Sequence, residues 1–338
     1  MKNNKLGIAF VVGVMAIFAG YLVSSGKINM VREHIWNLNW NWLAAACLSI
    51  ILYWLLEAKM VNNIIKSMGG HQTFFEAFKI TMIGQFFSGI TPFASGGQPM
   101  QLYLLTKQKV PVGQGTSALM SKFIVYQGTL VIYALVLLIF KAQFFIKNIQ
   151  NLFVLVVIGF GVNAVVIGAL VFFSRSKDVN KSLLAKLIRF GHKIKLVKDP
   201  VKTIKNIETE VEEFHENAVQ LRQNKGLLIN TVFLTVVQLT LYFVVPYFIY
   251  RSFGLGGGNL VNILSATAFV LMITSFIPIP GASGGAEGGF YLIFGLFFIG
   301  KYILTAIILW RVMTYYFWIM VGGIWMIFTD FSHKEVVS

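Results

Sequence analysis

The chain has 338 residues, of which 57% are hydrophobic and 12% are charged, and its mean hydropathy is +0.73. Because a soluble domain carries about 25% charged residues, this composition excludes a soluble globular protein, a disordered chain and a disulfide scaffold. Lys and Arg number 28 against 13 Asp and Glu, which gives a net charge of +15. In so apolar a chain we assign this excess to membrane topology and anionic lipid, with no nucleic-acid partner.

Apolar stretches long enough to cross a bilayer, about 20 residues each, predict six transmembrane helices. They cover residues 6–26, 35–56, 123–140, 148–174, 226–250 and 312–329, and the last begins upstream near residue 302. The first has a long apolar core and is followed by five more, so we interpret it as a retained helix and not as a signal peptide. The single cysteine, Cys47, lies in the second span, so we expect no intrachain disulfide.

Two further stretches, residues 80–106 and 252–286, carry no charge but contain clusters of Pro and Gly. Such clusters break the hydrogen-bond ladder of a helix, so each stretch is expected to form a helix, a loop and a second helix. Irregular backbone at membrane depth is tolerated only inside protein or along a water-filled cavity. We therefore predict two re-entrant helical hairpins, at residues 74–107 and 259–300.

Residues 175–226 form the only long polar segment, which is too short for a catalytic domain with its own core. Pro200 is expected to start a helix there, with apolar residues at helical spacing and glutamates on the outer face. That stripe is Ile204, Ile207, Val211, Phe214, Ala218 and Leu221. We interpret the segment as a cytoplasmic amphipathic loop resting on anionic lipid, with a partner-binding site as the alternative.

An internal repeat relates the two Pro- and Gly-rich breaks. Residues 91–97 (TPFASGG) and 279–285 (IPGASGG) match at five of seven positions, 188 residues apart. The flanking spans repeat in the same order, which makes residues 35–141 a first repeat and residues 226–329 a second. Chance similarity of two loops rich in small residues is the weaker explanation, because the match continues without a gap at Tyr103/Tyr291 and Leu104/Leu292.

The distribution of Lys and Arg sets the orientation. With both termini in the cytoplasm, 20 of these residues lie on the cytoplasmic side and 6 on the outer side. The first hairpin then opens to the cytoplasm and the second outward, so the repeats are inverted, which is typical of transporters. We therefore expect an all-α polytopic membrane protein, a single membrane domain over residues 1–338, in the bacterial cytoplasmic (inner) membrane.

The hairpin loops are candidates for ligand binding. Paired glycines let backbone N–H groups approach an anion, and a helix that starts after the loop directs its positive end toward it. The loop residues with suitable chemistry are Gln85, Ser95, Gly96, Gly97, Gln98, Ser283, Gly284 and Gly285. Close packing of helices through small residues is the alternative explanation.

Charged residues within a span are costly and indicate functional sites. Lys122 and Arg311 occupy nearly equivalent positions of the two repeats, where they would receive an anionic headgroup from opposite leaflets, and Glu287 is the expected partner of Arg311. The alternative is that each cation extends to the nearest interface. Glu57 is interpreted as a charge at the end of its span.

Signatures of catalysis are missing from the sequence. All five histidines lie outside the predicted spans, no span contains Asp, and no HExxH, GxSxG, P-loop or CxxC motif occurs. We therefore expect no catalytic residue, no metal and no cofactor.

The two loop motifs resemble those of a known family. Residues 84–99 (GQFFSGITPFASGGQP) and 278–288 (PIPGASGGAEG) are similar to the flippase-like family called the lysylphosphatidylglycerol synthase transmembrane region. This region is the membrane part of the bacterial multiple peptide resistance factor, and the resemblance covers essentially the whole chain. It implies flipping of aminoacylated phosphatidylglycerol, in support of antimicrobial peptide resistance. In that factor a separate cytosolic domain makes the lipid, and we expect a stand-alone member because the sequence ends at Ser338 without room for it.

The leading hypothesis is a lipid flippase that moves a polar phospholipid headgroup between leaflets. One alternative is a membrane enzyme that modifies lipid headgroups, such as a lysyl or glycosyl transferase. Another is a scaffold that binds a lipid synthase without transporting anything. The expected partners are membrane phospholipids with anionic headgroups, with a second copy of the chain or a separate lipid synthase as further candidates.

Overall fold

The computed structural model describes residues 35–176, 200–275 and 277–329, together with isolated positions elsewhere. These residues form helices and no strand, so the predicted all-α class is confirmed. The predicted span at residues 6–26 and most of residues 177–199 lie outside the described part. In chain order the elements are α3 (Trp40–Ser67), α4 (Phe74–Ile90), η1 (Pro92–Ala94), α5 (Gly97–Lys107), α6 (Val112–Arg175), α8 (Pro200–Gln223), α9 (Lys225–Phe243), α10 (Val245–Ser252), α11 (Leu260–Thr274), η2 (Pro280–Ala282), α12 (Gly285–Phe294), α13 (Gly300–Arg311), the π-helical η3 (Val312–Tyr316) and α14 (Phe317–Ile327).

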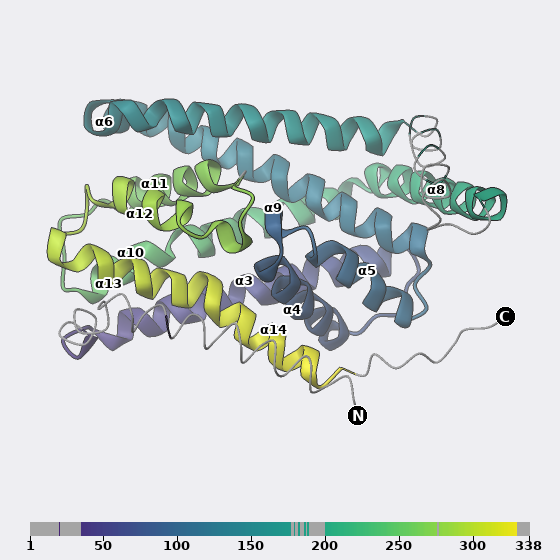
Figure 1. The fold of residues 1–338 in the computed structure, drawn as a ribbon, viewed down its shortest axis with the longest axis horizontal. Coiled ribbons are helices and arrows are strands. Elements are labelled where there is room, and N and C mark those ends of the chain that lie inside the picture. Colours follow the sequence, from purple (N-terminus) through teal and green to yellow (C-terminus); the bar gives the residue numbers. More distant parts are fainter. Residues whose placement is uncertain are drawn as a thin grey trace.

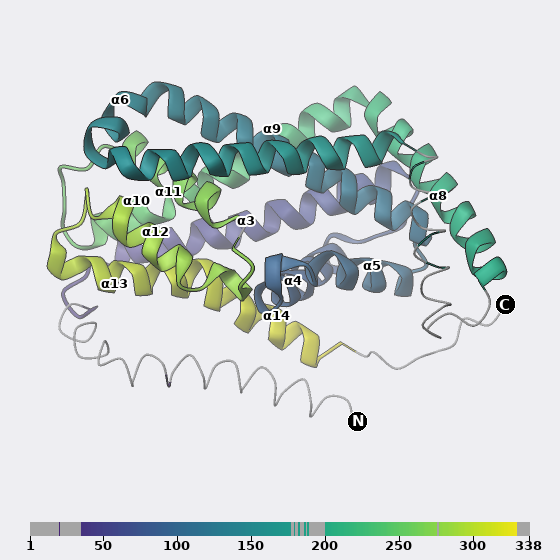
Figure 2. The same cartoon turned by 45° about the horizontal axis from the view of Figure 1, so that its top comes forward.

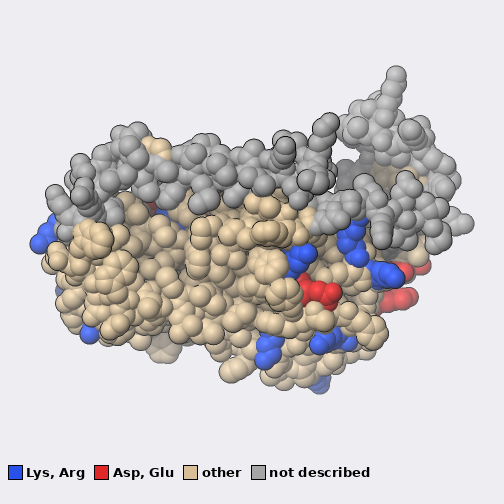
Figure 3. All heavy atoms as spheres, turned by 90° about the horizontal axis from the view of Figure 1, so that it is seen from below, with Lys and Arg blue, Asp and Glu red and all other residues tan. Residues whose placement is uncertain are grey.

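Four stretches of the described helices are long and apolar enough to cross a membrane: Trp40–Ser67, Val112–Asn148, Lys225–Ser252 and Gly300–Ile327. The last joins α13, η3 and α14 into one helix, as expected from a span that begins near residue 302. Figure 3 shows charged side chains at the left edge and over the right-hand half of one face, with a broad uncharged surface between them. The protein is therefore a polytopic membrane protein.

Polar residues at the helix starts explain where several elements begin. Asn39, Asn224 and Asn259 accept hydrogen bonds from backbone N–H groups in the first turns of α3, α9 and α11. The helix α3 begins at Trp40, within the predicted span 35–56, and continues beyond the end of that span to Ser67. Glu57 is therefore an interior residue of α3, and its interpretation as a charge at the end of a span is wrong.

The helix α6 contains two of the predicted spans, residues 123–140 and 148–174, without a non-helical loop between them. It reverses direction within its length, so that two arms run side by side (Figures 1 and 2). Phe145 lies 4.7 Å from Phe269 between ring centroids, and Gly159 lies against the backbone of Met272. In a straight helix Phe145 and Gly159 would be about 21 Å apart, whereas Phe269 and Met272 are one turn apart on α11.

The two helix–break–helix units correspond element by element. The helices after the breaks, α5 and α12, start at the matched residues Gly97 and Gly285, and α6 and α13 start at the matched residues 112 and 300. Both breaks have the same unusual backbone, with φ of 54° at Phe93 and 60° at Gly281. In Figure 1, α4 and α5 lie toward the right end of the molecule and α11 and α12 toward the left end. The breaks η1 and η2 contact each other between them.

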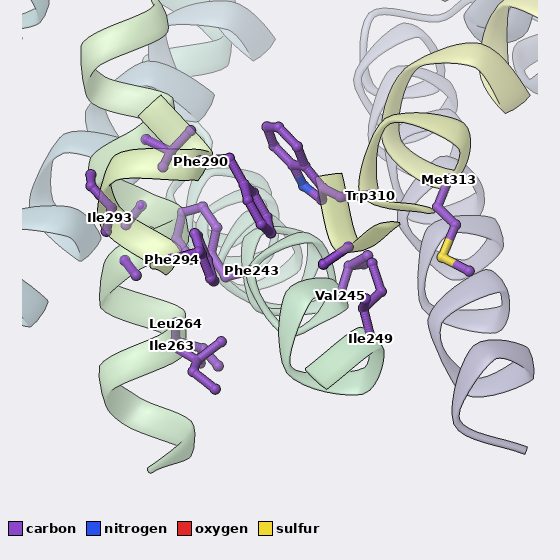
Figure 4. Packing of buried hydrophobic residues seen from close by; sticks show 14 of the residues in the cluster. Phe243, Val245, Ile249, Ile263, Leu264, Phe290, Ile293, Phe294, Trp310 and Met313 are labelled. Atoms are coloured by element: carbon purple, nitrogen blue, oxygen red, sulfur yellow. The ribbon is translucent and has the colours of Figure 1, made fainter. Parts of the chain in front are cut away.

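An aromatic and aliphatic core fixes the second unit (Figure 4). Phe290 stacks on Phe294 with ring centroids 4.0 Å apart and lies 4.9 Å from the ring of Trp310, which joins α12 to α13. Phe243 adds α9 to the same cluster. Because successive helical residues point about 100° apart, burying Trp310 in this core directs the next residue, Arg311, to another side of α13.

The predicted helix after Pro200 is present as α8, which packs against α6. Its buried residues include four members of the predicted stripe, Val211, Phe214, Ala218 and Leu221. The side chains of Ile204 and Ile207 lie outside the description. The described part of the apolar stripe is therefore covered by protein.

Close contact between α14 and α4 gives a test of the packing. Gly322 lies so close to the carbonyl oxygen of Met82 and to Phe86 that a Cβ atom would collide with them, whereas a Cβ atom at Gly161 in α6 would meet nothing within 4 Å. We expect Gly322→Ala to destabilise the protein by about 1–3 kcal/mol, because the two helices must move apart. Gly161→Ala, the matched control, should leave stability unchanged or slightly raised. Thermal unfolding in detergent measures both, and equal melting temperatures would contradict this packing.

Candidate functional site

A cavity of about 630 Å³, lined by both apolar and polar side chains, lies between the two units. Its lining comes from α3, α4, α5, the first arm of α6, α9, α11, α12, α13, η3, α14 and both breaks. The cavity therefore lies where the two helix–break–helix units meet, and it is bordered by helices from both.

The first charged group in the cavity is an ion pair between α3 and α6. The Lys122 ammonium lies 2.6 Å from Oε1 of Glu57, and both side chains are about nine-tenths buried. The side-chain amide of Gln238, on α9, donates to the other carboxylate oxygen of Glu57 at 3.0 Å. Lys122 therefore does not extend to the nearest interface but neutralises a buried carboxylate.

The second ion pair lies beside the break η2. Arg311 donates from Nε to Oε1 of Glu287 at 2.7 Å and from Nη2 to the carbonyl oxygen of Gly281 at 2.9 Å. The other carboxylate oxygen of Glu287 accepts the backbone N–H of Gly284 at 2.6 Å. The predicted pairing of Glu287 with Arg311 is confirmed, and it anchors the loop on both sides.

Tyr315 links the second break to the first unit. Its ring lies against Gly281, where a Cβ atom would collide with it, and 5.0 Å from the Arg311 guanidinium. Its hydroxyl donates to the carbonyl oxygen of Gly89 at 2.8 Å. Gly89 lies in the last turn of α4, where helix carbonyls have no partner within the helix. One helix, Gly300–Ile327, thus contacts the second break and the end of α4, and its π-helical segment is at the point of contact.

Each of the four helices that supply these polar groups also presents a tyrosine four residues away. The pairs are Tyr53 and Glu57, Lys122 and Tyr126, Gln238 and Tyr242, and Arg311 and Tyr315, and all eight residues line the cavity. Residues four apart lie on one face of a helix. This spacing is a sequence signal for the cavity that the sequence analysis missed.

The structure places the predicted site residues in two groups. Those that line the cavity are Gln85, Ser95, Gly97, Gln98, Lys122 and Arg311. Those outside its lining are Gly96, Ser283, Gly284, Gly285 and Glu287. The backbone N–H of Gly96 donates to the Thr91 hydroxyl at 2.8 Å, and the Ser283 hydroxyl donates to the Pro280 carbonyl oxygen. These loop groups therefore bond within their own breaks.

Several polar atoms of cavity-lining residues lack a partner among the described residues. They are Oε1 of Gln238 and the indole N–H groups of Trp310 and Trp318. Buried polar atoms without partners are rare in folded proteins, so these three are available to a ligand. The described residues contain no group of three or more His, Cys, Asp and Glu that would hold a metal ion.

The hydroxyl of Tyr315 gives a stability test of the link between the units. Tyr315→Phe removes the donor to the Gly89 carbonyl, so we expect a loss of about 1–3 kcal/mol of unfolding free energy. Tyr291→Phe is the matched control, because Tyr291 is half exposed and the change should be neutral. Thermal unfolding of the purified variants measures the difference. Identical curves would show that the hydroxyl does not connect α4 to η3.

The chain was also compared with known proteins. A family model described as the lysylphosphatidylglycerol synthase TM region matches residues 5–322. A protein described as a UPF0104 membrane protein, from Archaeoglobus fulgidus, is 26% identical over 325 residues, which is 94% of each chain. Because the family model covers nearly the whole chain, the protein belongs to the lysylphosphatidylglycerol synthase transmembrane-region family.

Proposed function

We propose that the protein is a lipid flippase that moves the polar headgroup of a phospholipid, such as an aminoacyl-phosphatidylglycerol, between leaflets. The observation that carries this proposal is a cavity at the junction of two matched helix–break–helix units, lined by the buried Lys122–Glu57 ion pair and by Arg311, whose partner Glu287 lies outside the lining. Membership of a family named for a lipid synthase supports a role in lipid chemistry.

The depth of the charged groups supports a site near the bilayer centre. Arg311, Lys122 and Glu57 each lie about 15 Å along their helix from the nearer end, at 1.5 Å per residue. A hydrocarbon core is about 30 Å thick. Charges placed this deep are costly unless they serve a pathway, and here they line a cavity.

The arrangement of the breaks supports alternating access. The units α4–η1–α5 and α11–η2–α12 lie toward opposite ends of the molecule and meet at their breaks (Figure 1). If each is a re-entrant hairpin, the two are inverted repeats, and exchanging their conformations exchanges the side to which the cavity opens. The headgroup would cross through the cavity while the acyl chains remain in the bilayer.

The proposal includes an orientation. The excess of Lys and Arg places both termini and the end that carries α5 and α8 in the cytoplasm. The lipid would be delivered from the cytoplasmic leaflet by a separate synthase. The cell membrane is the proposed location.

Arg311 is the side chain to test. In vesicles that contain the purified protein and a tail-labelled phospholipid, we expect Arg311→Ala to slow leaflet exchange about 10-fold or more, because it removes a buried cation that would bind phosphate. Arg311→Lys should retain part of the rate, since it keeps the charge but loses the bidentate geometry. Arg222→Ala, at an exposed position of α8, is the control and should exchange lipid normally. Unchanged exchange in a folded Arg311→Ala protein would remove Arg311 from the pathway.

A further inference from the structure

We propose that the headgroup bound in this cavity is zwitterionic, with one phosphate and one primary ammonium group, as in a phosphatidylethanolamine-type lipid. This inference rests on the proposed function and names its substrate class. It differs from the anionic headgroup that the excess of basic residues predicts.

The first argument is the charge balance of the site. The two cations, Lys122 and Arg311, are each paired with a carboxylate, so the described groups sum to zero. An anionic headgroup that draws Lys122 away would leave Glu57 buried and unpaired, and breaking a buried ion pair from one side is strongly unfavourable. A headgroup that carries both charges can replace the Lys122–Glu57 pair with two new ion pairs, one between its ammonium and Glu57 and one between its phosphate and Lys122.

The second argument is a set of acceptors around Glu57 that fits an ammonium group. Gln238 donates through Nε2 to Glu57 and to the Tyr53 carbonyl oxygen, which fixes the amide orientation. Its Oε1 is fully buried and has no partner among the described residues. A primary ammonium offers three N–H donors, which the Glu57 carboxylate and Gln238 Oε1 can accept. The rings of Tyr53, Tyr126 and Tyr242 also line the cavity, and tyrosine faces attract cations.

The third argument is that Arg311 can bind a phosphate without losing its partners. Its contacts with Glu287 and Gly281 use two of its five N–H groups. Lys122, once displaced from Glu57 by the ammonium, supplies a second cation on a flexible stem. Tyr242 lines the same cavity, with its ring 5.8 Å from that of Tyr53.

The number of available carboxylates limits the headgroup to one ammonium. Glu287 lies outside the cavity lining, where Arg311 and the Gly284 N–H hold its carboxylate. Among the described cavity-lining residues this leaves Glu57 as the one carboxylate that can exchange its partner. A lysyl headgroup carries two ammonium groups, so its second would have no carboxylate here.

The experiment compares tail-labelled phosphatidylethanolamine, phosphatidylglycerol and lysyl-phosphatidylglycerol in vesicles that contain the full chain. Reduction of the label by external dithionite measures leaflet exchange. We expect the wild type to exchange phosphatidylethanolamine about 10-fold or more faster than either other lipid. Glu57→Gln should lose that preference, whereas Glu216→Gln, on the exposed face of α8, should keep it. Measurable exchange at equal rates for the three lipids in the wild type, or a preference that survives in Glu57→Gln, would overturn the inference.

A second variant protects the test against misfolding. Glu57→Gln leaves Lys122 buried without its carboxylate, so the double variant Glu57→Gln with Lys122→Gln removes both charges together. It should fold with near-normal thermal stability and also show no preference for phosphatidylethanolamine. A folded double variant that retains the preference would overturn the assignment of the ammonium to Glu57.

A binding measurement separates this inference from the proposed function. Short-chain phosphatidylethanolamine should raise the melting temperature in detergent more than short-chain phosphatidylglycerol, and Glu57→Gln should abolish the difference. If no lipid exchanges between leaflets, the proposed flippase is wrong, but selective stabilisation would still support the headgroup assignment. Equal stabilisation by both lipids would overturn it. Glycerophosphoethanolamine, which lacks the acyl chains, tests a soluble ligand. If it stabilises the protein as strongly as the lipid does, the inference that the bound headgroup belongs to a lipid is wrong.

Discussion

The ion pair between Arg311 and Glu287 connects a charged group of the cavity to the backbone of the second break. Its two side chains satisfy the Gly281 carbonyl and the Gly284 N–H, one on each side of the turn. Backbone groups in a broken membrane helix must find partners because the hydrocarbon core offers none. Tyr315, one turn beyond Arg311, extends the same support to the end of α4. One helix face thus supports the second break and the end of the helix that precedes the first.

The two breaks satisfy matched backbone N–H groups with different side chains. At matched positions the N–H group of Gly96 bonds to the Thr91 hydroxyl and that of Gly284 to the Glu287 carboxylate, and the backbone differs there, with φ of −80° at Gly96 and 84° at Gly284. The position matched to Glu287 is Pro99. The second break therefore carries a charge that the first lacks, and the first unit contributes its charges from α3 and α6. The cavity combines an uncharged break with a charged one, although the two share a motif.

The sequence analysis predicted the breaks well because Pro and Gly clusters act locally. It failed where long-range packing decides the outcome. The predicted span ends at residue 56 because Glu57 interrupts the apolar run, yet Lys122 neutralises that carboxylate, Gln238 donates a hydrogen bond to it, and the helix continues to Ser67. The reversal between the predicted spans 123–140 and 148–174 is present, but the connection between them remains helical, which the sequence analysis did not predict.

By itself the sequence determined the membrane class, the broken helices, the repeat and the pairing of Glu287 with Arg311. These follow from composition, helix-breaking residues and the high cost of an unpaired charge in an apolar environment. Only the tertiary structure decided that Glu57, Gln238 and four tyrosines belong to the same cavity as Arg311. In the sequence these residues look like ordinary members of their own helices. Only the packing of the helices removes their side chains from water and brings each polar group to its partner.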